Sequence, residues 1–217
     1  MGLELSERKR NIIFVNVLIG CIVSTMLSTA LTTILSSVMD SFNIDAAMGQ
    51  WLTSSYSLVM GIMMPLTAYL INTISTKKLY IVSIGLFIVG LIFCIFATKF
   101  EIMLLGRLIQ ACGAGILTAM TQVIALTIFP AEKRGTAMGW YGLSVGVAPV
   151  IAPTLAGIIS DSVGWRMFFV LVLIIAIISF IVSVFVFENV LETKNQKLDI
   201  ASFIYSICGF GGITLMV

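Results

Sequence analysis

The sequence predicts an all-α membrane protein, and two observations support this fold class. Of the 217 residues, 59% are hydrophobic and 10% are charged, whereas a soluble domain usually carries about a quarter charged residues. The charged residues also divide the chain into seven long uncharged runs. A bilayer core of about 30 Å needs roughly 20 apolar residues in a helix, and a helix pairs its own backbone groups in lipid. Membrane-spanning helices are therefore predicted within these runs.

The boundaries of the helices follow from the limits of the runs. In chain order the runs are Asn11–Met39, Ala46–Thr76, Leu79–Thr98, Leu108–Ala131, Gly135–Ser160, Met167–Phe187 and Ile200–Val217. Six of them are long enough to span a bilayer, whereas the last is barely so. We expect four parts, which are an N-terminal segment over 1–10, a six-helix bundle over 11–187, a connection over 188–199 and the start of a seventh helix over 200–217. Because the chain stops inside the last apolar run, we expect the front part of a longer protein.

The first run could also belong to a signal peptide, because it follows Arg8, Lys9 and Arg10. The apolar region of a signal peptide is about 7–15 residues long and ends at a site of the Ala-x-Ala kind. This run is about twice that length and contains no such site. It is therefore predicted to be the first membrane helix.

Lysine and arginine in the short connections predict the orientation in the membrane. With the N-terminus inside, the outer segments carry only Lys99 and Arg166, and Arg107 lies within a predicted helix. The inner segments carry the remaining positive residues, which are Arg8, Lys9, Arg10, Lys77, Lys78, Lys133, Arg134, Lys194 and Lys197. We therefore expect a multi-pass protein of the cell membrane with a cytoplasmic N-terminus.

Several classes of function are excluded by what the sequence lacks. It contains no histidine, and its four cysteines lie in apolar runs without a close pair, as small buried side chains do. No GxGxxG or P-loop motif occurs. The net charge of +2 is too small to indicate a nucleic-acid partner. We therefore expect no enzyme activity, no metal site, no cofactor and no nucleic-acid binding, and we expect the lipid bilayer as a partner.

One charged residue, Arg107, lies well inside a predicted helix. With Phe100 as the outer end, Arg107 is about 10 Å deep along the helix axis. A guanidinium at this depth is costly unless it faces protein or a water-filled cavity, so Arg107 is a candidate functional residue. The alternative is a side chain that reaches back to the outer headgroups. Gln110 lies on the same face, and Gly113 and Gly115 allow another helix to approach closely.

The fifth run combines prolines with small residues. Pro149 and Pro153 remove two backbone hydrogen bonds and are expected to bend the helix. Gly142 and Gly146, and the alanines spaced four apart over Ala148–Ala156, make smooth faces for close packing. We expect these faces to have no partner within this chain. One interpretation is a tightly packed structural helix, and the other is a bent helix that rocks against a partner. The residue types leave both interpretations open.

The second run carries Tyr56, Met60 and Met63 on one face. Thioether and aromatic side chains suit an apolar binding pocket. Packing in the core or against lipid accounts for the same stripe, so the sequence leaves both interpretations open.

Several of these stretches together resemble the major facilitator superfamily, in its branch of drug:proton antiporters with fourteen helices. Leu104–Gly115 resembles the family's fourth-helix motif, and Ala148–Gly157 resembles its fifth-helix antiporter motif. The turns over Phe129–Gly139 and Gly164–Arg166 are similar to those that flank the fifth helix. The short connection over 188–199 resembles that of the fourteen-helix branch.

The resemblance implies the N-terminal half of a transporter, whose substrate site lies near the membrane midplane between two halves. It implies export of small amphipathic drugs in exchange for protons, with the missing C-terminal half as a partner. The substrate or coupling residues that it implies are Arg107, Gln110, Thr29 and Thr32. The antiporter-motif helix, expected to pack against the missing half, would use Gly142, Gly146, Pro149, Pro153 and Gly157.

The first helix departs from the family pattern, because Leu27 stands where the family has an acidic or amide residue. Two alternatives to drug export remain open from the sequence. One is uptake or exchange of a metabolite by the same fold, which would call for further buried charges that match the substrate. The other is a truncated, non-transporting membrane component that assembles with a full-length transporter or inhibits it.

Overall fold

The computed structural model describes residues 6–190, which form six α-helices joined by short turns. Each described helix is long and apolar enough to cross a membrane, which confirms the all-α, six-helix fold class. The predicted seventh helix and most of the 188–199 connection lie outside the described residues. The helices are α1 (Glu7–Phe42), α2 (Ala46–Thr73), α3 (Thr76–Ile95), α4 (Phe100–Ile128), α5 (Ala131–Val163) and α6 (Arg166–Val186).

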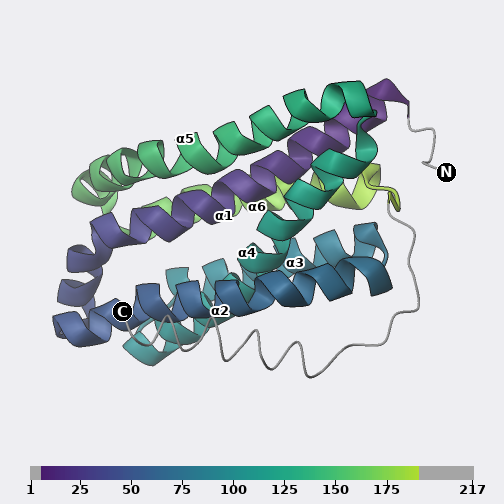
Figure 1. Ribbon diagram of the computed structural model, residues 1–217. Coiled ribbons are helices and arrows are strands. Elements are labelled where there is room, and N and C mark those ends of the chain that lie inside the picture. The colour runs from purple at the N-terminus through teal and green to yellow at the C-terminus, as the bar shows by residue number, and fades with distance from the viewer. Residues whose placement is uncertain (1–5, 191–217) are drawn as a thin grey trace.

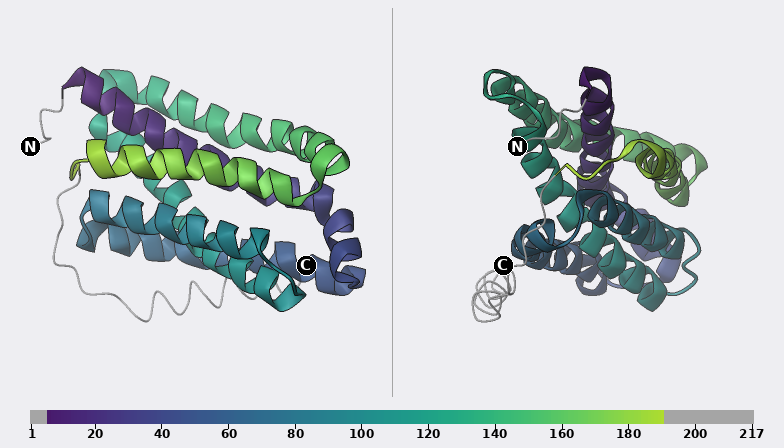
Figure 2. Two further views of the ribbon diagram at one scale, coloured as in Figure 1. Left: turned by 180° about the vertical axis from the view of Figure 1, so that it is seen from behind. Right: turned by 90° about the vertical axis from the view of Figure 1, so that its right-hand side faces the viewer.

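Successive helices run antiparallel and form two groups. In Figure 1, α1, α5 and α6 lie on one side, α2 and α3 lie on the other, and α4 crosses obliquely between them. Figure 2 shows the same arrangement from behind. The start of α1 and the end of α6 meet at one end of the bundle, where Lys9 donates a hydrogen bond to the Glu188 carboxylate. Lys9 and Glu188 therefore lie on the same side of the bundle.

The turn between α5 and α6 fastens the opposite end of the bundle. Gly164 has a φ of 93°, a conformation that side chains disfavour. The next residue, Trp165, donates its indole N–H to the Ser41 hydroxyl at 2.8 Å. Arg166 donates to the carbonyl of Ala97 at 3.0 Å. This turn therefore ties the end of α1 and the α3–α4 connection to the start of α6.

Glycines bring α3 and α4 into direct backbone contact. A Cβ atom built at Gly90 of α3 would lie 2.6 Å from the carbonyl oxygen of Gly106. A Cβ atom at Gly113 of α4 would lie 2.4 Å from the carbonyl oxygen of Ser83. Only glycine fits at such distances, so these residues set how closely the helices pack. The expected role of Gly113 in close packing is confirmed.

The methionine stripe of α2 packs against α4. A Cβ atom at Gly115 would lie 2.7 Å from Cβ of Met63 and 3.0 Å from the carbonyl oxygen of Met60. Both methionines are half-buried and contact the core, and Tyr56 is fully buried. The stripe therefore belongs to the helix interface, and the packing interpretation accounts for it.

Candidate functional site

Arg107 lies in the interior of the bundle, held on α4 between α2 and α3. Its side chain is fully buried, so it does not reach the headgroups. Its Nε donates to the backbone carbonyl of Leu52 at 3.4 Å, and its Nη1 donates to Oε1 of Gln110. The guanidinium carbon lies 3.8 Å from the centroid of the Tyr56 ring. A desolvated cation–π contact of this kind contributes about 2 kcal/mol or more.

The Arg107 side chain has no carboxylate partner among the described residues. The ion pairs found over residues 6–190 lie at the end of the bundle that carries the N-terminus. Leu27 is fully buried and supplies no charge. The described acidic residues all lie at or near helix ends, and they are Glu7, Asp40, Asp45, Glu101, Glu132, Asp161 and Glu188. The positive charge is therefore stabilised only by neutral groups among the described residues, namely a carbonyl, an amide oxygen and an aromatic face.

Two neighbouring donors at this site have no acceptor. Nη2 of Arg107 and Nε2 of Gln110 are buried and make no hydrogen bond within the described part of the chain. An unpaired buried donor costs about 1–3 kcal/mol, and more for a charged group. Each donor could hold an oxygen acceptor, such as a carboxylate, a carbonyl or a hydroxyl group.

The structure joins Gln110 to Arg107 but does not join the two predicted threonines to them. The Thr29 hydroxyl donates to the carbonyls of Thr25 and Met26 on its own helix, at 3.3 and 3.2 Å. The Thr32 hydroxyl is exposed and donates to the carbonyl of Thr29 at 2.6 Å. The direct partners of the guanidinium are instead Gln110, Tyr56 and the Leu52 carbonyl. Sequence reasoning assigned Tyr56 to an apolar stripe and missed its contact with the cation.

A second buried polar cluster, which the sequence analysis missed, connects α1, α3 and α6. The Tyr80 hydroxyl donates to the carbonyl of Asn16 at 2.9 Å. The Ser179 hydroxyl donates to Oδ1 of Asn16 at 2.9 Å, and Nδ2 of Asn16 donates to the carbonyl of Ser179 at 3.2 Å. All three side chains are buried. Each of these residues is one of several polar residues in its helix, so the sequence does not single it out.

The small residues of α5 divide into a buried face and an open face. Ala148, Ala152 and Ala156 are buried in the core of this chain, so the expectation that they lack a partner within the chain is wrong. The small-residue spacing indicates close packing but does not identify the neighbour, which is α1. Gly142 and Gly146 have nothing within 4 Å of an added Cβ atom and remain open.

The remaining residues of the antiporter-motif helix lie along α5. Pro149 and Pro153 are half-buried inside the helix, which continues through both of them. A Cβ atom at Gly157 would lie 3.8 Å from Cγ2 of Thr33 in α1. These residues therefore lie at the edge of the α1–α5 interface rather than near Arg107.

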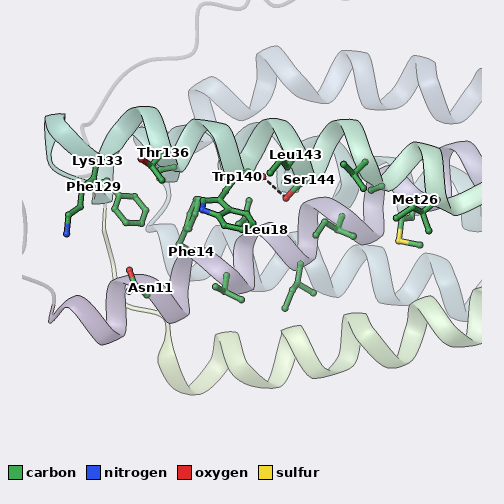
Figure 3. Close-up of a pocket in the computed structure, with 17 residues that line it drawn as sticks. Asn11, Phe14, Leu18, Met26, Phe129, Lys133, Thr136, Trp140, Leu143 and Ser144 are labelled. Atoms are coloured by element: carbon green, nitrogen blue, oxygen red, sulfur yellow. Dashed lines mark hydrogen bonds between the residues drawn. The ribbon is translucent and has the colours of Figure 1, made fainter.

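An apolar groove of about 1000 Å³ lies between α1 and α5. Figure 3 shows Phe14 and Leu18 of α1 facing Trp140 and Leu143 of α5 across it. Most of the lining is aliphatic or aromatic. The groove is a surface feature of the bundle and is distinct from the buried Arg107 site.

Six apolar helices around a buried cation and small-residue interfaces define a polytopic membrane protein of transporter architecture. A model of the family described as Major Facilitator Superfamily matches residues 17–216. The chain therefore belongs to the Major Facilitator Superfamily.

Several curated proteins are similar to this chain in sequence. "Uncharacterized MFS-type transporter YcnB" of Bacillus subtilis (strain 168) is 40% identical over 212 residues, which cover 98% of this chain and 45% of that protein. "Lincomycin resistance protein LmrB" of the same organism is 36% identical over 81% of this chain and 36% of its own length. "Multidrug export protein EmrB" of Haemophilus influenzae is 29% identical over 79% of this chain and 34% of its own length. The chain spans less than half the length of each of these relatives.

A solved structure shows the same fold. The crystal structure of the peptide transporter POT in complex with sulfate superposes with a TM-score of 0.74 at 10% sequence identity. The match covers 94% of this chain and 44% of that transporter. At this identity the likeness concerns the arrangement of the helices alone.

Proposed function

We propose that this chain forms the N-terminal half of a secondary transporter that exports amphipathic drugs from the cell in exchange for protons. The chain is similar to proteins named for lincomycin resistance and for multidrug export, which supports the substrate class. The proposed transporter lies in the cell membrane with its N-terminus in the cytoplasm, as the distribution of positive residues predicts.

The observation that carries this proposal is the pair of unpaired donors on Arg107 and Gln110. Buried polar groups in a membrane bundle are costly and mark substrate or ion pathways. Because no described carboxylate contacts Arg107, the proton-accepting group of the proposed cycle would come from the rest of the transporter. In an alternating-access cycle, that acceptor would meet the two donors in one state and leave them in the other.

Replacement of Arg107 in the complete transporter tests this role. We expect Arg107→Ala to reduce drug efflux from energised vesicles to background, while the amount of protein in the membrane stays unchanged. Arg8→Ala is the matched control, because Arg8 is an exposed arginine at the start of α1. Efflux at the wild-type rate in Arg107→Ala would contradict the proposed site.

Cysteine labelling tests the proposed orientation. In a background without native cysteines, Ser162→Cys should react with a membrane-impermeant maleimide from outside the cell, and Lys78→Cys should react only after permeabilisation. Both positions are exposed at helix ends. The reverse pattern would overturn the orientation.

A further inference from the structure

We propose that the groove between α1 and α5 binds amphipathic aromatic anions, such as hydrophobic organic acids. This inference rests on the proposed function, and it names the chemical class of the exported compound. The groove lies outside the Arg107 site and is separate from its unpaired donors.

The walls of the groove suit a flat apolar ligand. Its volume of about 1000 Å³ lies at the upper end of typical small-molecule sites. The rings of Phe14 and Phe129 meet edge to face with centroids 4.9 Å apart. Trp140 lines the opposite wall, on α5, and is 56% exposed, so its ring offers an open stacking surface. Aromatic scaffolds would therefore be favoured over flexible aliphatic ones.

The polar groups of the groove gather at one end. Figure 3 shows Asn11, Lys133 and Thr136 near Phe129, whereas Met26 lies toward the opposite end. The other lining hydroxyl, on Ser144, donates to the carbonyl of Trp140 within α5. A ligand that fits this arrangement has one polar end and a long apolar body.

The charge at the polar end is positive. Among the lining residues that belong to the described part of the chain, Lys133 is the one ionisable side chain. The Arg10 guanidinium lies beside it, 5.2 Å from the Phe129 ring centroid, and its buried Nε has no hydrogen-bond partner in residues 6–190. Both cations contact the same carboxylate, that of Glu7, at 3.3 and 3.1 Å. Two cations that share one acid leave a net positive charge.

This charge distribution discriminates between ligands. An incoming carboxylate or sulfonate can replace Glu7, because both partners of the Glu7–Lys133 pair are more than half exposed and such pairs are weak. A lipophilic cation would find no acid in the groove lining and would face Lys133 and Arg10. The groove therefore favours anionic over cationic amphiphiles.

A matched pair of dyes tests the proposal. The anionic probe is 1-anilinonaphthalene-8-sulfonate, and the neutral probe is N-phenyl-1-naphthylamine, which has the same rings without the sulfonate. Because the chain contains three tryptophans, Trp51→Phe with Trp165→Phe leaves Trp140 as the donor for energy transfer. Binding to the 217-residue chain in phosphatidylcholine nanodiscs is then measured by saturable energy transfer from Trp140.

We expect a substitution at the charged end of the groove to weaken binding of the anionic dye only. Lys133→Ala should weaken binding of the sulfonate dye about tenfold, equivalent to about 1.4 kcal/mol, and leave the neutral dye unchanged. Lys78→Ala, at an exposed lysine outside the groove lining, should change neither dye. Val147→Phe should weaken both dyes by filling the groove, whereas Val150→Phe on the open surface of α5 should not.

Three outcomes would overturn the proposal. The first is a Lys133→Ala variant in which binding of both dyes weakens equally, or in which binding of neither dye changes. The second is unchanged binding in Val147→Phe. The third is displacement of the sulfonate dye by phosphatidylglycerol in the nanodisc or by the second half in the complete transporter, which would identify lipid or protein as the occupant. Arg107-dependent efflux that persists in any of these cases would leave the proposed function intact.

Discussion

Two polar clusters lie in the interior of the bundle, and they differ in how completely their hydrogen bonds are made. In the cluster of Asn16, Tyr80 and Ser179, the side-chain polar atoms all have partners. At the Arg107 site, one guanidinium nitrogen and the amide nitrogen of Gln110 have none among the described residues. Both clusters are fully or almost fully buried.

The difference separates a structural role from a functional one. Protein interiors pair nearly all of their buried polar groups, so the Asn16 cluster is what stability alone would produce. The Arg107 site keeps a charge and two free donors at a cost in stability. The proposed role of this site is an interaction that the isolated bundle does not supply. The free energy of unfolding should therefore fall more on a change at the Asn16 cluster than on a change at the Arg107 site.

The largest expected effect on stability is at Asn16. Asn16→Ala removes two hydrogen bonds, one with the carbonyl and one with the hydroxyl of Ser179, and leaves a cavity in the core. We expect the free energy of unfolding in detergent micelles to fall by about 2–3 kcal/mol. Asn72→Ala is the control, because its amide bonds only the nearby carbonyl of Ala68 on the exposed side of α2. An equal loss of unfolding free energy in both variants would show that the Asn16 cluster does not stabilise the fold.

A smaller effect is expected at Arg107 in the same assay. Arg107→Leu loses the contacts with Tyr56, the Leu52 carbonyl and Oε1 of Gln110, but it also removes a buried charge without an acid partner. Relief of the cost of burying an uncompensated charge offsets the loss of these contacts, so we expect a net change within about 1 kcal/mol. A loss as large as that in Asn16→Ala would show that Arg107 holds the fold, and the contrast between the clusters would disappear.

The helices could be predicted from the sequence because charges rarely lie in lipid. The uncharged runs located all six described helices, and α4 begins at Phe100, the residue taken as its outer end. The start of α5 differs, because the helix begins at Ala131 and includes Glu132, Lys133 and Arg134, which the runs assigned to a turn. Charged residues in the first turns of a helix can extend beyond the bilayer, so the charge pattern marks the membrane boundary and not the helix end.

The site could be predicted only in part, because side-chain partners depend on how helices cross. Gln110 was found because residues three apart share a helix face. Thr29 and Thr32 do not contact Arg107, because their hydroxyls bond carbonyls about one turn back in their own helix. Their role at a substrate site stays a prediction. Asn16 and Ser179 are 163 residues apart, and nothing in either helix alone indicates the other.

The smallest expected effect on stability is at Glu7, where the ion pairs are exposed instead of buried. Glu7 precedes the uncharged run that begins at Asn11, outside the membrane-spanning part of α1. The hydrogen bond and charge of Lys133, followed by those of Arg10, hold the pKa of Glu7 below its ordinary value of 4.5. A lowered pKa in the folded state means that this pairing contributes stability above the ordinary pKa and loses it as the pH falls through the folded pKa. Glu7→Gln should therefore unfold at a slightly lower temperature than the wild type at neutral pH, and the difference should vanish in acid. A difference that persists in acid would show that Glu7 acts through packing, and a difference as large as that of Asn16→Ala would show that exposed and buried contacts contribute equally to this fold.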